Sequence, residues 1–216
     1  MRFVYLHGFA SGPTSRKACF FAEKFREAGL TLEVPELTPA EAEGGFEALT
    51  LSGQLRLLDG LIGGEPCILM GSSMGGYLSA IYAARHAEVQ RIVILAPAFC
   101  MARRWHEAWG PERMEEWRTQ GYAEVFHYAK QRDERIGYQL MEDAALYPDY
   151  PEVTQPALVF HGREDAIVPV EFAREFTGRS PNARLVEFDS DHELTDCMEQ
   201  MWDETKGFLP QLNGGG

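Results

Sequence analysis

Five residues, Gly71 to Gly75, constrain this chain more than any other segment. They read G-x-S-x-G, an apolar run at residues 66–70 precedes them, and a helix-like stretch at residues 77–84 follows. A strand, a sharp turn and a helix in this order are the context in which the pattern indicates a nucleophile elbow. Such a turn holds its serine, here Ser73, in a strained conformation, and the two glycines supply the small neighbours it needs. A glycine-rich turn with a capping serine is the alternative, so partners for Ser73 must be sought elsewhere in the chain.

The composition indicates a globular domain without nucleic-acid or membrane partners. The 216 residues are 45% apolar and 25% charged, and this length predicts one domain or one domain with an insertion. The net charge is −13, from 20 basic and 33 acidic residues, and no run of Lys or Arg offsets it. Such a charge disfavours binding to nucleic acid or to anionic membranes. No apolar stretch reaches the ~20 residues that a membrane-spanning helix needs.

The four cysteines are widely spaced and predict free thiols. Cys19 and Cys67 lie within apolar patterns, so we expect buried thiols in a reducing compartment. No Cys/His cluster has the spacing of zinc ligands, and we expect no metal. Residues 2–6 read as a strand, and no charged segment followed by an apolar one resembles a secretory leader. We therefore expect a cytoplasmic protein.

Short apolar runs alternate with helical patterns along most of the chain, which is typical of a mostly parallel sheet covered by helices on both faces. We expect strands at residues 3–6, 30–35, 67–70, 91–96, 157–161 and 183–188. We expect helices at residues 15–28, 46–61, 77–84, 171–177 and 193–208. The sequence thus predicts an α/β core formed by residues 1–98 and 156–212.

Residues 99–155 interrupt this alternation. The segment is aromatic and charged, and no strand is apparent in it; its patterns look helical, for example at Met114, Trp117, Tyr122 and Phe126. A βαβ connection needs only about a dozen residues, so a segment of this length is generous for one crossover. We expect a helical cap insertion over the sheet edge at which the strands end, with a pair of ordinary crossover helices as the alternative. We expect residues 213–216 to form a flexible tail.

A serine hydroxyl needs a general base to act as a nucleophile, and the base needs an orienting acid. In an open α/β sheet these groups lie at the carboxyl ends of strands. His192 follows the last expected strand, and Asp165 follows the strand before it. The sequence therefore predicts a catalytic set of Ser73, Asp165 and His192. Competing candidates for the acid are Glu164, Asp189 and Asp191.

Two backbone N–H groups are expected to bind the oxyanion that forms when Ser73 attacks a carbonyl. One belongs to Met74, which opens the helix after the elbow and benefits from the helix dipole. The second comes from the loop after the first strand. That loop, residues 7–13, contains glycines, and we expect the N–H of Phe9 to be the donor.

Taken together, these segments resemble the small bacterial α/β-hydrolases, and among them the YqiA-like esterases. The resemblance rests on residues 5–9 with 11–13, residues 71–76, residues 161–165 with 168–169, and residues 191–192. It implies the α/β-hydrolase fold and serine carboxylesterase activity on short acyl esters, with Ser73, Asp165 and His192 as the triad. Residues 99–155 depart from the family pattern by being longer and more aromatic, which leaves the acyl-chain preference open.

We expect the hydrolysis of a small-molecule carboxylic ester, with a small or medium acyl group, through an acyl-enzyme and without a cofactor. A thioesterase acting on acyl-CoA or an acyl carrier protein is one alternative, with Arg103 and Arg104 as candidate anion ligands. A hydrolase-fold binding protein without catalysis is the alternative from another class. The sequence leaves the oligomeric state open. Candidates for the substrate pocket are Ser11, Trp105, Trp109 and Tyr128.

Overall fold

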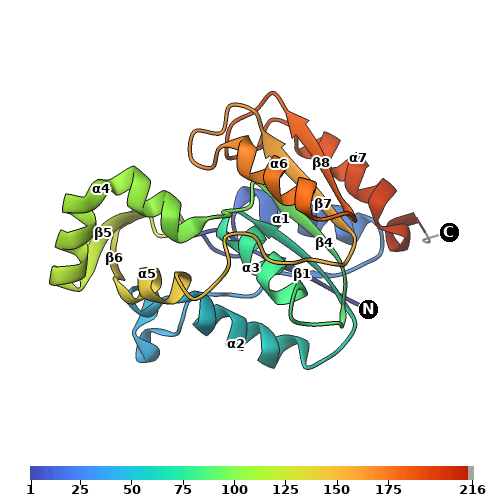
Figure 1. The fold of residues 1–216 in the computed structure, drawn as a ribbon. Coiled ribbons are helices and arrows are strands. Elements are labelled where there is room, and N and C mark those ends of the chain that lie inside the picture. Colours follow the sequence, from blue (N-terminus) through green and yellow to red (C-terminus); the bar gives the residue numbers. More distant parts are fainter. Residues whose placement is uncertain (214–216) are drawn as a thin grey trace.

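A six-stranded parallel sheet organises the chain (Figure 1), as the apolar runs predict. The computed structural model describes residues 1–213. The strand order is β2-β1-β3-β4-β7-β8, and every neighbouring pair is parallel. The strands are β1 (Arg2–Leu6), β2 (Leu32–Glu33), β3 (Cys67–Ser72), β4 (Val89–Leu95), β7 (Ala157–Gly162) and β8 (Ala183–Phe188).

Helices cover both faces of this sheet, because successive side chains of each strand point to opposite faces. Val4 packs in one core cluster with the helices α2 (Leu51–Ile62), α3 (Met74–Ala83) and α6 (Val170–Arg179). Tyr5, the next residue, packs in a second cluster with the helices α1 (Arg16–Glu27) and α7 (Met198–Phe208). Three short 3₁₀ turns complete the core: η1 (Glu41–Glu43), η2 (Gly45–Ala48) and η3 (Pro210–Asn213).

Several predicted element boundaries are wrong, and local caps explain the clearest case. The helix expected from residue 46 begins at Leu51, because the Thr50 hydroxyl accepts a hydrogen bond from the N–H of Gly53 at 3.0 Å and caps it there. The strand expected at residues 30–35 is only Leu32–Glu33, and the helix expected from residue 193 begins at Met198.

Residues 99–155 form a cap beside the core (Figure 1). It contains α4 (Met101–Gln120), the strands β5 (Tyr122–His127) and β6 (Arg132–Gly137), and α5 (Gln139–Ala144). β5 and β6 pair as an antiparallel hairpin, so the expectation that this segment lacks strands is wrong. From residue 123 to residue 127 exposure alternates with a period of two, which is a strand pattern. The helical reading failed because it joined Phe126, which faces outward on the hairpin, to apolar residues of α4.

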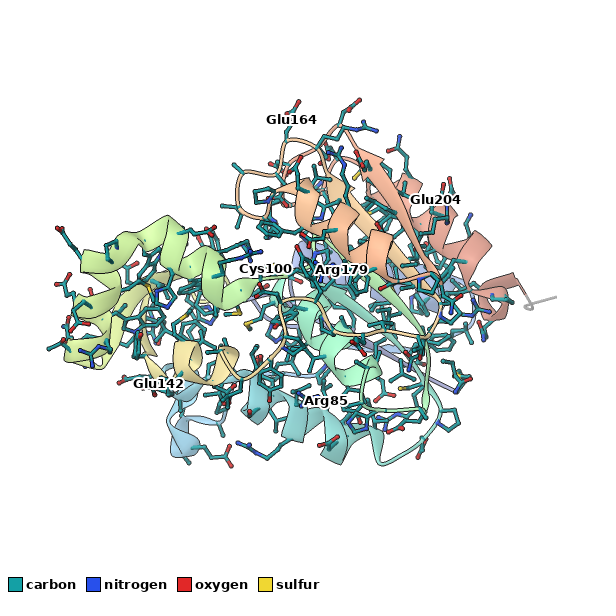
Figure 2. All side chains as sticks on the ribbon, viewed as in Figure 1. Arg85, Cys100, Glu142, Glu164, Arg179 and Glu204 are labelled. Atoms are coloured by element: carbon teal, nitrogen blue, oxygen red, sulfur yellow. The ribbon has the colours of Figure 1, made fainter. Side chains whose placement is uncertain are left out.

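The cap has its own aromatic core. The rings of Trp105, Trp109 and Trp117 lie 5.0–5.4 Å from one another, and the indole N–H of Trp117 donates to the carbonyl oxygen of Ile136 at 2.9 Å. α4 is broken at Gly110 (φ 73°, ψ 166°), directly before Pro111. Cys100, directly before α4, is labelled where the cap joins the core (Figure 2).

Three further expectations concern the thiols, the membrane and the end of the chain. Cys67 is a buried free thiol, but Cys19 is exposed, so the expectation of burial is wrong for it. Within residues 1–213, no helix combines the length and the apolar character needed to cross a bilayer. Of the expected tail, Asn213 ends the 3₁₀ turn η3, and residues 214–216 lie outside the described part of the chain.

We predict that Gly75→Ala destabilises the protein by about 3 kcal/mol or more, because a Cβ at this position would lie 2.1 Å from the carbonyl oxygen of Leu6. The matched control is Gly60→Ala in α2, where a Cβ meets no atom within 4 Å. That control should gain roughly 0.5–1 kcal/mol, because alanine favours the helix. Urea denaturation of both variants measures the difference, and equal stabilities would contradict the packing argument.

Candidate active site

Ser73 stands at a sharp turn between β3 and α3. Its backbone has φ 52° and ψ −117°, a strained conformation for a residue with a side chain. Its N–H donates to the carbonyl oxygen of Leu95 at 2.8 Å, and its own carbonyl oxygen accepts from the N–H of Ala98 at 2.9 Å. Within residues 67–83 every residue except Ser73 is buried. The fold therefore holds one serine in a strained turn and leaves that residue partly accessible.

The turn requires glycine on both sides of the serine. A Cβ on Gly71 would lie 2.3 Å from the carbonyl oxygen of Gly75, and one on Gly75 would lie 2.1 Å from the carbonyl oxygen of Leu6. No rotamer change relieves a clash with backbone atoms. The two glycines of the motif thus let α3 start in direct contact with β1 and β3.

Three side chains from three strand ends form one hydrogen-bonded chain. The Ser73 hydroxyl lies 3.1 Å from Nε2 of His192, and Nδ1 of His192 lies 2.7 Å from Oδ2 of Asp165. Ser73 follows β3, Asp165 follows β7 and His192 follows β8. The structure thus brings together the three residues that the sequence singles out. The carboxylates of the competing acids Glu164, Asp189 and Asp191 are exposed, and within residues 1–213 none of them forms a hydrogen bond or ion pair with His192.

The carboxylate of Asp165 is buried and fully hydrogen-bonded. Oδ1 accepts from the N–H groups of Ile167 at 2.9 Å and Val168 at 2.7 Å. Oδ2 accepts from His192 and also lies 3.1 Å from Nε2 of His161. Burial alone would raise the pKa of Asp165, but the hydrogen bonds from His161, His192 and Val168 outweigh it and hold that pKa well below its usual range. Asp165 is therefore ionised at neutral pH.

His161 is the second histidine of this site. Its ring is fully buried, and Nε2 donates to the carbonyl oxygen of Val168 at 2.7 Å. Because the same N–H faces Asp165, the ring braces the loop that carries the acid. The sequence alone, in which His161 simply ends an expected strand, did not connect this ring to the carboxylate.

Phe9 and Met74 lie on the two backbone segments that meet at Ser73. Within residues 1–213, neither N–H has a protein acceptor, so both are available to a ligand. A Cβ on Gly8 would lie 3.4 Å from the Cβ of Ser73, which shows how closely the loop after β1 packs against the turn. The N–H of Met74 also opens the ten-residue helix α3, where the helix dipole favours negative charge.

A cavity of about 840 Å³ opens beside Ser73 and His192. All four residues that the sequence nominates for a pocket line it, namely Ser11, Trp105, Trp109 and Tyr128. Its walls come from the core and from the cap, which lies at the left in Figure 1. Such a volume is typical of a site for a small molecule.

Other lining residues escaped the sequence analysis. Arg16 and Lys17 line the cavity from the start of α1, and Ser72 lines it from the end of β3. Their signal was position, since α1 follows directly on the loop that carries Phe9. Within residues 1–213, no group of three or more His, Cys, Asp or Glu side chains is arranged to hold a metal ion.

Comparison with known proteins places this chain. The sequence matches the model of the Uncharacterised protein family (UPF0227) over residues 2–209. A comparison with curated proteins finds no match. The solved structures that share the architecture include the α/β hydrolase domain-containing protein 10 from mouse. The two sequences are 21% identical, the alignment covers 97% of this chain and 90% of that chain, and the TM-score is 0.79.

Two bacterial structures are similar to the same extent. A putative hydrolase from Agrobacterium vitis S4 has 22% identity, with 96% of this chain and 87% of that chain covered and a TM-score of 0.81. Est1E from Butyrivibrio proteoclasticus, solved with ferulic acid bound, has 18% identity, with coverages of 97% and 88% and a TM-score of 0.80. At these identities the likeness establishes the shared fold. The chain belongs to the family UPF0227, the YqiA-like group that its motifs resemble, and it has the α/β-hydrolase fold.

Proposed function

We propose that this protein hydrolyses carboxylic esters of small or medium acyl groups, with Ser73 as the nucleophile and an acyl-enzyme as the intermediate. The observation that carries the proposal is the unbroken chain of hydrogen bonds from Ser73 through His192 to the ionised Asp165. An imidazole placed between a hydroxyl and a carboxylate can take a proton from one side while the other side fixes its tautomer.

The reaction has two similar halves. His192 Nε2 accepts the Ser73 proton as Oγ attacks the ester carbonyl carbon, and the carbonyl oxygen becomes an oxyanion. Collapse of this tetrahedral intermediate breaks the bond to the alcohol oxygen, which takes the proton from His192. Water then attacks the acyl carbon of the acyl-enzyme and loses a proton to Nε2 of His192. Collapse of the second tetrahedral intermediate breaks the bond to Ser73 Oγ, which takes that proton back from His192, and the acid leaves.

The oxyanion is the charge that develops along this path, and two free N–H groups are the proposed means of stabilising it. In this proposal the donors are the N–H groups of Phe9 and Met74. Preorganised donors act without reorganisation at the moment of reaction, and each contributes about 10²–10³-fold to turnover.

The thioesterase alternative loses the feature that suggested it. The guanidinium of Arg104 is buried and donates to the carbonyl oxygens of Phe99 and Ile167, both at 2.8 Å. Arg103 donates to Sγ of Cys100 and pairs with the carboxylate of Asp149. Both arginines are held by groups of the protein, so neither is by itself evidence for a phosphate-binding site, and we favour the ester.

We predict that Ser73→Ala lowers kcat for a short ester by on the order of 10⁶, as loss of the nucleophile does in other serine hydrolases. Wild-type protein should form a covalent adduct with a fluorophosphonate, and mass spectrometry should place it on Ser73. Ser72→Ala is the matched control, because this variant retains Ser73, and the probe should still label it. A wild-type protein without an adduct would instead support a hydrolase-fold binding protein.

We predict that Trp109→Ala moves the acyl preference toward longer chains. The ring lines the cavity from the cap, so its removal opens space for further methylene groups. Each methylene that becomes buried should raise kcat/KM about fourfold relative to wild type. A series of 4-nitrophenyl esters from acetate to decanoate measures the profile. Leu146→Ala is the control, because Leu146 is exposed and does not line the cavity. Identical profiles for Trp109→Ala and wild type would show that Trp109 does not limit the space for the acyl group.

We predict a pH-dependent stability term from Asp165. Its pKa in the folded protein lies below the value of about 3.9 for an unfolded chain, so its contribution is present above that pH and is lost as the pH falls below it. Asp165→Asn lacks this contribution. The difference in free energy of unfolding between wild type and variant should therefore be largest at neutral pH and shrink toward pH 3. A difference that stays constant from pH 7 to pH 3 would contradict the depressed pKa.

A further inference from the structure

The cavity beside Ser73 has two chemically different walls. The wall toward the cap is apolar and largely aromatic, and it is lined by Phe9, Met101, Trp105, Trp109 and Val125. The wall formed by the start of α1, the end of β3 and the loop after β8 is polar, and it is lined by Ser15, Arg16, Lys17, Ser72, Glu193 and Thr195. Ser73 and His192 line the same cavity. A ligand that fills it must therefore be amphipathic.

Lys17 places a buried positive charge in the polar wall. Only 8% of the residue is exposed, and burial lowers the pKa of its amine, although the carboxylate of Glu193 opposes this effect. Nζ donates to the carbonyl oxygen of Glu193 at 2.9 Å and lies 3.6 Å from that residue's carboxylate. An ammonium group has three N–H donors, and only one of them is used in a short hydrogen bond. Lys17 can therefore still donate to an anion in the cavity.

Arg16 adds a second positive charge that is not neutralised. Within residues 1–213, its guanidinium has no ion pair or hydrogen bond. By contrast Arg26, on the same helix, is paired with Glu23. Arg16 and Lys17 also stand in the first turn of the twelve-residue helix α1, whose free N–H groups favour negative charge.

A buried hydroxyl supplies an independent sign that this wall is incomplete without a ligand. Tyr5 is fully buried on β1 and lines the same cavity, and its hydroxyl oxygen, although close enough to the Ser72 side chain to interact with it, makes no hydrogen bond of normal geometry. Buried hydroxyl groups are rarely left without a partner. A polar group of a ligand or a water at this wall would supply one.

The proposed mechanism decides which part of an ester meets the polar wall. The leaving alcohol must receive its proton from Nε2 of His192, so the alcohol lies on the His192 side of the cleaved bond. His192 is followed by Glu193, whose backbone carbonyl is held by Lys17. The alcohol is therefore the part nearest to Lys17 and Arg16, and the acyl group is left with the aromatic wall.

We infer that the substrate is an ester of an apolar acyl group whose alcohol part carries an anionic group, a carboxylate or a phosphate, bound by Arg16 and Lys17 at the start of α1. This inference rests on the proposed esterase function. The local charge supports it: Arg16 and Lys17 face one carboxylate, that of Glu193, in a chain whose net charge is −13. Arg104, the third cation that lines the cavity, donates to backbone carbonyl oxygens. Arginine and lysine are the residues that bind such oxyanions.

The test uses matched esters that differ only in the charge of the alcohol part. One pair is O-butyryl-lactamide and O-butyryl-lactate, and the other is 1-butyrylglycerol and its 3-phosphate; release of butyrate gives kcat/KM for each. The wild-type protein should prefer the charged member of at least one pair by on the order of tenfold, as one charge-assisted hydrogen bond provides. The pair that shows the preference identifies the anion as carboxylate or phosphate.

Substitutions at the polar wall locate the preference. Arg16→Gln and Lys17→Met should each reduce the charged-to-neutral ratio severalfold, and Glu193→Gln should raise it by removing the opposing charge. Arg26→Gln is the matched control on the same helix and should leave the ratio unchanged. Because Lys17 also holds the loop of His192, its loss can slow both esters, and the ratio separates anion binding from that effect.

Two outcomes overturn the inference: no preference for a charged ester in either pair, or a preference that survives both Arg16→Gln and Lys17→Met. The same compounds titrated into Ser73→Ala by calorimetry give their dissociation constants without turnover. If no ester is hydrolysed, the proposed function fails, yet these constants still show whether Arg16 and Lys17 select the anion.

Discussion

The strained backbone of Ser73 is the constraint on which the site depends. Holding a residue other than glycine at φ 52° and ψ −117° costs on the order of 1–3 kcal/mol of conformational free energy, and the surrounding structure must supply more than this. It does so by hydrogen bonds to Leu95 and Ala98 on either side of the peptide and by direct contact of α3 with β1. That contact leaves no room for a Cβ at Gly71 or Gly75, so the packing of the turn itself requires both motif glycines.

The parallel sheet converts this local turn into a site. Because its strands run in the same direction, the residues after β3, β7 and β8 meet at one edge, although Ser73 and His192 are 119 positions apart. Each strand end supplies one member of the hydrogen-bonded chain. The backbone also fixes the orientation of the Asp165 carboxylate. Its Oδ1 accepts from the N–H groups of Ile167 and Val168, which leaves Oδ2 for the two imidazoles.

Sequence reasoning reached the sheet and the three aligned side chains because both follow from local rules. Apolar runs predict strands, and polar residues that follow these runs are expected at the carboxyl edge of the sheet. It failed where tertiary contacts decide: the outward-facing Phe126 looked helical beside Trp117, although it belongs to a hairpin that packs on α4. Lys17 has no motif of its own; only its contact with Glu193, 176 positions away, connects it to the site.

The cap and the loop after β1 contact each other, which limits how far either can vary alone. The ring of Phe9 packs edge-on against Trp105 of the cap at 5.2 Å, and the N–H of Ala129, at the tip of the hairpin, lies 3.4 Å from the carbonyl oxygen of Ala10. The side chain of Phe9, a residue that lines the cavity, therefore takes its position from the aromatic residues of the cap. In the proposed mechanism, a change of the cap that enlarges the space for the acyl group also loosens the support of the Phe9 backbone, so breadth of acyl acceptance and stabilisation of the oxyanion oppose each other.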